Sequence, residues 1–588
     1  MKHLLLSTTA LALLAAMPVS TTFAKDALSF TAIAAPSDDA AKRLVVSSPS
    51  VTIDGATAPL AYRTLLRSGD KLASGTFGLL LDAKGQALMG KDGAPLVSAS
   101  TDFSSILRKN GQLYVVSHFE NSPAAVYLTH VEQGADGMLK ALDTMPIDFS
   151  ADGGLWVPCA GSITPWGTHL GSEEYEPDAR KIEAATTMAD VEDMGDPATM
   201  AMYFGFDPAT GDLDGFRQVF NPYAYGYITE IAVNDDGTAS GNKHYAMGRF
   251  AHELGLVLPD EKTAYLSDDG TNVSLYRFVA DEAGKLDAGT LYAVKFNQTS
   301  ADNGGEGDVS WIDLGHASSA EVKALIDQKL TFSDMFEVGE MNEDGTCGEG
   351  FGVSIANGVI ECLKVKPGME LAASRLETRR FAALQGATVE LRKEEGVTFD
   401  PDHNRLYVAM SEIGNGMADM ASDGKYEKGG NNDFRVAANP CGGVYALDLD
   451  ASYVAVNMKG LVVGKPASYP EGDQWAGNTC DIDGIGNPDN ISYIPGRGTL
   501  LIGEDATTAH QNDAVWSYDL ATAELTRILT TPYGAESTSV YAYPNINEFG
   551  YVMAVVQHPY GESDEDKLQS PNDAQAYLGY IGPFPKFD

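Results

Sequence analysis

The sequence has few cysteines and little positive charge for its length. Five cysteines occur among 588 residues, and 40 Lys and Arg stand against 82 Asp and Glu, which gives a formal net charge of −42. This excess of negative charge disfavours nucleic acid and anionic membrane surfaces as partners. A phosphate-bearing substrate would also be repelled, unless cations bound within the site reverse the charge locally. The composition therefore favours a metal-containing site if the substrate is anionic.

The N-terminal residues have the layout of a secretory signal peptide. Lys2 and His3 precede an apolar run at residues 4–19, and the small residue Ala24 ends the segment. The run is shorter than the roughly 20 residues that a membrane-spanning helix needs, and no later apolar run is long enough to span a membrane. We expect residues 1–24 to be removed, and the mature chain to be a periplasmic or secreted monomer without membrane insertion.

Cys159 is the odd cysteine, and two carboxylates follow it closely in the sequence. Thiolate selects transition metals such as iron or zinc, whereas carboxylates such as those of Glu173 and Glu174 suit calcium, magnesium and ferric iron. The combination indicates a mixed metal cluster, although a buried structural thiol is the alternative for Cys159 alone. The four other cysteines, which could form two disulfides of undetermined pairing, are Cys347, Cys362, Cys441 and Cys480.

The rest of the chain favours an all-β fold, specifically a β-propeller. Short apolar, β-branched and aromatic runs recur between Asp-Gly, Asn-Pro and Gly-rich turns, as in residues 112–117, 201–206, 264–267, 405–409 and 499–502. Such spacing is typical of propeller blades, whose loops converge at an axis, but no strict period fixes the blade number.

Two regions depart from the strand pattern. Residues 317–329 and 369–384 have helical spacing, so we expect a partly helical insertion at 297–385. Residues 25–60 are expected to form an irregular leader that docks on the first strands. The propeller itself would then occupy residues 61–588.

Further acidic residues recur beside the edges of predicted strands. A single one is more often a turn or capping carboxylate than a ligand. Because the loops of a propeller meet at its axis, distant carboxylates could nevertheless share one site. The recurring positions are Glu253, Asp268-Asp269, Glu394-Glu395, Asp489 and Glu504-Asp505.

Several motifs, taken in order, resemble those of the PhoX-type alkaline phosphatases. Each motif alone is weak, but the ordered set extends over most of the mature chain. The motifs are residues 164–168 leading to Glu173-Glu174, then 227–231, 248–253, 265–269, 395–399, 487–490 and 557–559.

The resemblance implies a six-bladed propeller that holds ferric iron and calcium and hydrolyses phosphate monoesters, with some activity on diesters. It also implies roles for individual residues. Cys159 would be the iron-binding thiolate, with Glu253 and Glu395 as metal-bridging carboxylates. One or both of Glu173 and Glu174 would serve the cluster, Asp489 would be another ligand, and Asp268 or Asp269 would bind calcium.

Two departures from the family pattern bear on the chemistry. Lys393 stands where the family has an Arg two positions before the residue that corresponds to Glu395, so we expect Lys393 to bind the phosphate; a surface lysine is the alternative. Arg392 should point to the opposite face of its strand. Glu412 replaces one of a pair of amides. The signal region also lacks the twin-arginine pair often seen in this family, which suggests Sec-type export.

Two other functions stay open at this point. One is a calcium-stabilised propeller that binds a ligand without phosphatase activity, for which Lys393 and Glu412 are the motivating residues. The other is a lactonase-type hydrolase. Cys159 argues against the lactonase, because chemistry that uses calcium alone has no need of a thiolate.

Overall fold

The computed structural model describes residues 28–192, 196–207, 211–419 and 425–587. The predicted signal peptide lies outside these residues. Antiparallel strands are the main secondary structure of the described residues, and successive strands can be taken as six groups of four, of which the third and fourth are joined in one nine-stranded sheet. Within the described ranges, no helix has the length and apolar character needed to cross a membrane.

The six groups follow one another along the chain. The first contains β6 (Thr101–Lys109), β7 (Gln112–Phe119), β8 (Ala125–Gln133) and β9 (Leu139–Pro146), and the second β10 (Ser162–Ile163), β11 (His169–Gly171), β12 (Thr229–Val233) and β13 (Ala239–Lys243). The third contains β14 (His252–Val257), β15 (Thr263–Asp268), β17 (Tyr276–Glu282) and β18 (Lys285–Ser300), and the fourth β24 (Glu394–Asp400), β25 (Arg405–Met410), β26 (Gly443–Asp448) and β27 (Asn457–Val463). The fifth contains β28 (Pro488–Ile494), β29 (Thr499–Glu504), β30 (Ala514–Asp519) and β31 (Leu525–Thr530), and the sixth β32 (Glu536–Ile546), β33 (Phe549–Gln557), β34 (Tyr577–Pro585) and β5 (Tyr62–Arg67).

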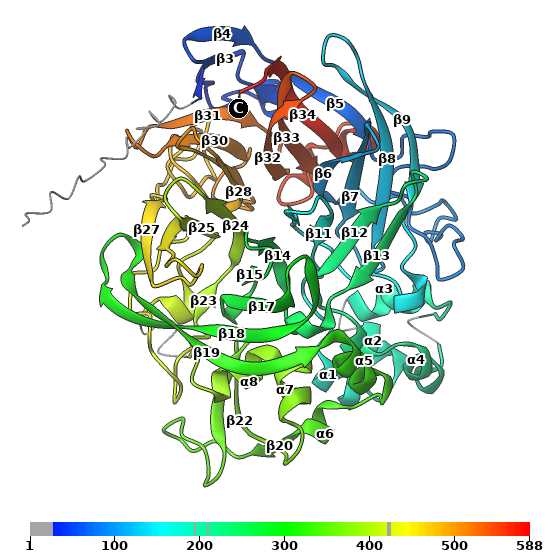
Figure 1. The fold of residues 1–588 in the computed structure, drawn as a ribbon, viewed down its shortest axis with the longest axis vertical. Helices are drawn as coiled ribbons and strands as arrows, with labels where there is room; N and C mark the ends of the chain where they lie inside the picture. Colours follow the sequence, from blue (N-terminus) through cyan, green and yellow to red (C-terminus); the bar gives the residue numbers. More distant parts are fainter. Residues whose placement is uncertain (1–27, 193–195, 208–210, 420–424, 588) are drawn as a thin grey trace, which may run out of the picture.

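The first strands of these groups, together with β11 of the second group, form a closed circuit. Strand β6 adjoins β11 and β32, β14 adjoins β10, β11 and β24, and β28 lies between β24 and β32. The last group closes the circuit, because β5 from the N-terminal part of the chain pairs with β34 from the C-terminal part. In Figure 1 the strand groups accordingly surround a common centre, with the blue and red segments side by side.

Burial on both faces explains why the strands read as continuous apolar runs. In β7, every residue from Leu113 to Phe119 is buried. Successive side chains of a strand point to opposite faces. Val115 accordingly packs in one cluster with Met553 of β33, and Val116 packs in another with Ile231 of β12. A sheet that packs between two other sheets is buried on both faces. Its strands are therefore continuously apolar in sequence, whereas a sheet with one solvent-exposed face alternates apolar and polar residues.

The expected helices at 317–329 and 369–384 are confirmed. They are α5 (Ser319–Asp327), which begins at a capping box between Ser318 and Glu321, together with α7 (Glu370–Leu376) and α8 (Thr378–Leu384). The same region holds the short helix α6 (Phe332–Met335) and a sheet of β20 (Phe336–Gly339), β21 (Gly352–Ala356) and β22 (Val359–Val365). The expected start at 297 falls inside β18, because β18 continues into a long hairpin with β19 (Glu306–Ser318) that joins the third group to β27.

A second helical segment lies between β11 and β12, and the strand expected at residues 201–206 was wrong, because residues 201–203 belong to a helix. The four helices of this segment are too short and too interrupted by Asp, Pro and Gly to give a sustained helical period. They are α1 (Ala179–Ala184), α2 (Met188–Glu192), α3 (Asp196–Tyr203) and α4 (Leu213–Val219).

The leader differs from the expectation in two respects. It contains strands β1 (Ser29–Phe30), β2 (Val46–Ser47), β3 (Ser50–Ile53) and β4 (Ala56–Pro59), so it is not irregular throughout. It docks on the last groups rather than on the first strands: β2 pairs with β31, and Val51 packs in one cluster with Val515 and Phe584. The reason is the closure through β5, which directs the preceding chain toward the C-terminal strands.

The cysteine assignment is confirmed. Cys347 is bonded to Cys362, Cys441 is bonded to Cys480, and Cys159 is a buried free thiol. The second bond ties the loop before β28 to the residues just before β26.

Candidate metal centre

Residues from all six groups of strands line one acidic cavity. Its volume is about 300 Å³. The lining residues with an ionisable side chain include Glu120, Cys159, Glu174, Tyr175, Glu253, Asp269, Lys393, Glu395, Glu412, Asp489, Asp505, Glu536 and His558. Lys393 is the one lysine or arginine among the described residues of this lining.

In every group of strands, the residues of the site come from the same end of the first hairpin. The first and second strands form a hairpin, so the start of the first lies beside the end of the second; Thr101 opposite Phe119 and Glu536 opposite Gln557 are examples. The residues at or near the start of the first strand are Asp102, Cys159, Glu253, Glu395, Asp489 and Glu536. Just after the second strand stand Glu120, Glu174, Asp269, Glu412, Asp505 and His558.

Irregular pairing helps to aim these side chains inward. The pairing with the second strand shifts register within the first few residues of β6, β14, β24 and β28. A bulge at such a place bends the strand and redirects the neighbouring side chain. The site therefore depends on a repeated backbone device as well as on acidic residues.

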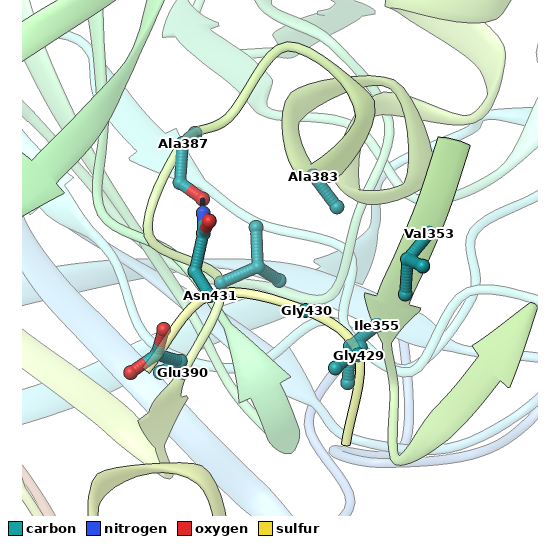
Figure 2. Close-up of a pocket in the computed structure, with 9 residues that line it drawn as sticks. Val353, Ile355, Ala383, Ala387, Glu390, Gly429, Gly430 and Asn431 are labelled. Atoms are coloured by element: carbon teal, nitrogen blue, oxygen red, sulfur yellow. Dashed lines mark hydrogen bonds between the residues drawn. The ribbon is translucent and has the colours of Figure 1, made fainter. Parts of the chain in front are cut away.

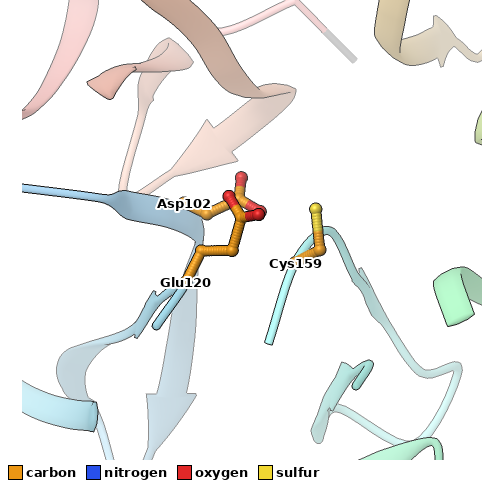
Figure 3. Close-up of side chains that lie close together, drawn as sticks. All are labelled: Asp102, Glu120 and Cys159. Carbon is orange, nitrogen blue, oxygen red and sulfur yellow. The ribbon is translucent and has the colours of Figure 1, made fainter. Parts of the chain in front are cut away.

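Four overlapping groups of side chains could each hold a metal ion, because their ligand atoms lie within 4.8 Å of one another. Cys159, Glu253 and Asp489 each belong to two groups, which links the four into one chain. Figure 3 shows the first group, in which the carboxylates of Asp102 and Glu120 face the thiol of Cys159. The groups are Asp102–Glu120–Cys159, Cys159–Glu174–Glu253, Glu253–Glu395–Asp489 and Asp489–Asp505–Glu536.

The donors have the properties expected of residues that bind metal. Both carboxylate oxygens of Asp102 are buried without a hydrogen-bond partner, as are Oε1 of Glu253 and Oδ1 of Asp489. Burying unpaired carboxylates is costly unless a cation or proton compensates. Burial raises the pKa of Asp102 and of Asp489 to about 7, and neighbouring acidic groups add to the effect. Cations of hard and intermediate character therefore fit this donor set.

Glu253, Glu174 and the thiol of Cys159 have the same electrostatic character. Burial, followed by repulsion from neighbouring carboxylates, raises the pKa of all three well above the usual values. Without cations, the cavity therefore keeps protons on part of its donor set. Metal binding would have to displace those protons.

Lys393 extends into the cavity as expected. Its Nζ lies 3.5 Å from Oε1 of Glu395 and 3.7 Å from Oδ2 of Asp505. Burial opposes the positive charge, but Glu395 and Asp269 outweigh it and raise the pKa of Lys393 well above its usual value. The ammonium group is therefore charged and directed at the acidic centre.

Arg392 is not among the residues that line the cavity, but it is paired with one of them. Its Nε lies 2.8 Å from Oε2 of Glu412, which lines the same cavity that Lys393 enters. Lys393 has a φ of 46°, so the backbone leaves the strand conformation directly after Arg392. Arg392 thus neutralises Glu412 at the rim.

Glu173 and Asp268 do not line the cavity. Glu173 accepts hydrogen bonds from the backbone N–H groups of Trp156 and Gly226, and Nζ of Lys243 lies 2.8 Å from its Oε1. Asp268 is paired with Arg379, whose Nε lies 2.9 Å from Oδ1. In both acidic pairs the second member, Glu174 or Asp269, faces the cavity, because adjacent side chains of an extended backbone point in opposite directions.

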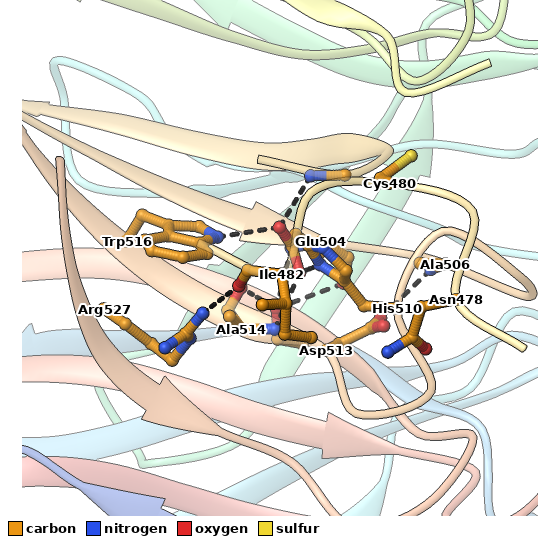
Figure 4. A network of polar contacts seen from close by, with 12 residues as sticks. Asn478, Cys480, Ile482, Glu504, Ala506, His510, Asp513, Ala514, Trp516 and Arg527 are labelled. Atoms are coloured by element: carbon orange, nitrogen blue, oxygen red, sulfur yellow. Dashed lines mark hydrogen bonds and ion pairs between the residues drawn. The ribbon is translucent and has the colours of Figure 1, made fainter. Parts of the chain in front are cut away.

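The pair Glu504-Asp505 follows the same rule. Asp505 lines the cavity, while Glu504 is buried behind it and accepts hydrogen bonds from Trp516 Nε1 at 2.7 Å and His510 Nδ1 at 2.9 Å. Figure 4 shows Glu504 at the centre of this network. Cys480, of the disulfide to Cys441, lies at its edge.

Sequence reasoning did not assign four members of the metal-binding groups. Asp102, Glu120 and Glu536 were not considered, and Asp505 was noted only as a recurring carboxylate. A pattern in the sequence could have identified them. An acidic residue at the start of one apolar run is matched by another just after the next apolar run, as expected for the two strands of a hairpin.

A second cavity lacks comparable chemistry. It has a volume of about 220 Å³ and is lined mainly by apolar side chains, with Glu390 at one side (Figure 2). The carboxylate of Glu390 accepts hydrogen bonds from the backbone N–H groups of Asp433 and Phe434. Its hydrogen-bonding capacity is thus used within the protein.

Comparison with solved structures finds a similar overall fold. The structure of Pseudomonas fluorescens PhoX in complex with vanadate, described as a transition state analogue, superposes with a TM-score of 0.59 at 18% identity, over 95% of this chain and 98% of that chain. A periplasmic gluconolactonase from Pseudomonas aeruginosa gives 0.29 at 11% identity, over 81% and 97%. A search of curated proteins found no match.

The family comparison is decisive. The profile of the family described as alkaline phosphatase PhoX matches residues 135–559, which is most of the chain and includes the hairpins of five of the six groups. The chain therefore belongs to the PhoX family of alkaline phosphatases, which are phosphomonoesterases.

Proposed function

We propose that this chain is an exported phosphatase that hydrolyses phosphate monoesters, and some diesters, in a cavity loaded with iron and calcium. The observation that carries the proposal is the chain of four ligand groups joined through Cys159, Glu253 and Asp489. An acidic cavity of this kind can accept a phosphate ester only when cations are bound in it.

The proposed architecture is a six-bladed propeller. Each group of four strands corresponds to one blade, and pairing of β5 with β34 closes the ring. The blade assignment explains why ligands from residues 102 to 536 share one cavity, because the first strands of all blades surround the axis.

The donor types suggest where each kind of ion would bind. Groups that contain Cys159 combine a thiolate with carboxylates, a set that suits iron. Asp489, Asp505 and Glu536 offer oxygen only, which suits calcium. When bound, such cations would act as Lewis acids that neutralise charge on the phosphate oxygens and the leaving group.

The residues of the chain contribute binding and orientation. Lys393 would donate hydrogen bonds to a phosphate oxygen, while Glu395 and Asp505 hold its ammonium group over the cavity. Lys supplies a mobile point charge rather than the planar fork of Arg, so Lys393 would restrict the direction of the phosphate less tightly.

Export through the Sec route is part of the proposal. The layout of residues 1–24 supports it, and the two disulfides are typical of an oxidising compartment. Metal would then be loaded after translocation.

A calcium-stabilised propeller without phosphatase activity is the second candidate. The pairing of Glu412 with Arg392 favours this candidate. The ion pair neutralises a carboxylate of the fourth group that would otherwise be available to bind a metal ion. Cys159 among the ligand groups weighs against this candidate and against a lactonase-type hydrolase.

The test is elemental analysis of the purified mature protein beside hydrolysis of p-nitrophenyl phosphate, with and without chelator. Iron together with calcium, and activity that is lost on chelation and blocked by vanadate, is the expected result. Calcium without iron or turnover would favour the binding propeller. Restoration of activity by calcium and iron added together, but by neither alone, would assign both ions to the reaction.

A further inference from the structure

The segment that carries Cys159 has no strand ladder of its own. Residues 154–161 lie outside any strand or helix, yet they are largely buried. Buried backbone groups need partners. Here side chains supply several of them: Glu173 accepts from the N–H of Trp156, and Ser172 Oγ donates to the carbonyl of Ala160 at 2.7 Å.

A buried pair of histidines supplies the partner of Cys159 itself. His118 on β7 has its Nδ1 2.9 Å from the carbonyl oxygen of Cys159. Its Nε2 lies 2.7 Å from Nε2 of His169 on β11. Nδ1 of His169 lies in turn 2.7 Å from Oγ of Ser105 on β6. All three side chains are fully buried, and none is needed as a metal ligand in the groups described above.

The chemistry of the carbonyl fixes where the first hydrogen is. A carbonyl oxygen only accepts hydrogen bonds, so His118 Nδ1 carries a hydrogen whatever the charge of the ring. A neutral ring carries a hydrogen on one nitrogen only, so its other nitrogen is free to accept a hydrogen bond. In that state His118 Nε2 accepts from His169 Nε2, and His169 Nδ1 accepts from the hydroxyl of Ser105. The hydrogen bonds then form one directed chain that ends at Cys159.

The His118 ring packs directly against the backbone of Gly171. A Cβ on Gly171 would come within 2.2 Å of Cε1 of His118, so only glycine fits there. The ring of Phe103 lies 4.9 Å from that of His169, centroid to centroid. Phe103 directly follows Asp102, a member of the first ligand group, so the same packing unit lies behind two donors of the metal centre.

We infer that His118 is a positioning residue for Cys159, and that the chain Ser105–His169–His118 holds the Cys159 backbone so that its thiol faces the neighbouring carboxylates. The hydrogen bond from the His118 ring holds the peptide group of Cys159, which limits rotation about the adjacent Cα–C bond and so limits the direction of the Cα–Cβ bond. The role in metal binding rests on the proposed function, whereas the placement of the thiol does not.

The inference is tested with two variants of His118 and one control. His118→Asn keeps an N–H at the δ position, and His118→Leu removes it. His130→Leu on β8 is the control, because His130 lies in the same sheet but bonds only to Gln112 among side chains. Two readouts are taken: the iron content of the purified protein, and the rate at which iodoacetamide alkylates Cys159 after chelator treatment, followed by mass spectrometry.

The expected result is a change of about fivefold in His118→Leu, with faster alkylation and a corresponding loss of iron, because one buried hydrogen bond is lost. His118→Asn and His130→Leu should stay within about twofold of wild type by the same reasoning. If His118→Leu matches wild type in both readouts, or if His118→Asn changes as much as His118→Leu, the inference is overturned.

A measurement on the unaltered protein covers the case in which His118→Leu does not fold. With ¹⁵N-labelled histidine, the His118 signal, identified by its loss in His118→Asn, should show a hydrogen bonded to Nδ1. A hydrogen on Nε2 alone would overturn the inference. Absence of iron from wild type would refute the proposed function instead, while the alkylation and NMR results would still decide the role of His118.

Discussion

Nζ of Lys243 lies 2.8 Å from Oε1 of Glu173, and neither side chain is exposed to solvent. Glu173 also accepts hydrogen bonds from the N–H groups of Trp156 and Gly226, so its carboxylate joins β13 to the segment that carries Cys159. The residue that looked like a metal ligand in the sequence thus supports the ligand loop from behind.

Replacing Lys243 with Met should destabilise the protein strongly. The substitution leaves the Glu173 carboxylate buried without its counter-ion, which typically costs about 3–5 kcal/mol. Chemical unfolding followed by circular dichroism measures the change. The matched control is Lys285→Met, whose ion pair with Glu282 is exposed and should contribute little. Equal stabilities of the two variants would contradict the structural role of the pair.

Lys393 should affect catalysis rather than stability. Loss of its ammonium group in Lys393→Met removes one charged hydrogen bond to phosphate, so kcat/KM for p-nitrophenyl phosphate should fall about 10- to 100-fold. Lys393→Arg should equal or exceed wild type, because Arg binds phosphate with a planar fork. Lys364→Met, which removes an exposed partner of Glu337, is the control. Unchanged kinetics in both Lys393 variants would make Lys393 a residue of the cavity wall only.

The sequence predicted the β-rich fold and the family better than it predicted which acidic residues line the cavity. Strand runs, the helices around residues 319–327 and 370–384, and the odd cysteine follow from local pattern, which is visible in one dimension. The choice between Glu173 and Glu174, or between Asp268 and Asp269, depends on which face of the hairpin meets the axis. Asp102 and Glu536 lie far apart in the sequence. Only the closed circuit of strands, which brings the first and last groups together, shows that both belong to one site.

Carboxylates shared between ligand groups should matter more than those in a single group. Glu253 belongs to two groups and Asp102 to one, so Glu253→Gln should lose more bound metal per protein than Asp102→Asn. Both substitutions keep the size of the side chain and remove its charge. Glu412→Gln serves as the control, because Glu412 belongs to none of the four groups and is already paired with Arg392. Metal content measured by mass spectrometry after desalting decides the order, and equal losses from the two ligand variants would argue against shared ions.

The metal-free protein should become less stable as the pH rises from about 4 to about 7. Burial raises the pKa of Asp102 and Asp489 to about 7 in the folded state, against an ordinary value of 3.8, so in this window the folded protein holds protons that the unfolded chain has released. Stability from these groups is therefore complete below the unfolded pKa and is lost as the pH approaches the folded one, by up to about 1.4 kcal/mol per pH unit for each group. Bound calcium replaces the protons as the compensating charge, so the trend should weaken or reverse in calcium-saturated protein. Melting temperatures at pH 5 and pH 7.5, with chelator and with calcium, measure this, and a chelated protein that melts higher at pH 7.5 would show that the carboxylates ionise without penalty.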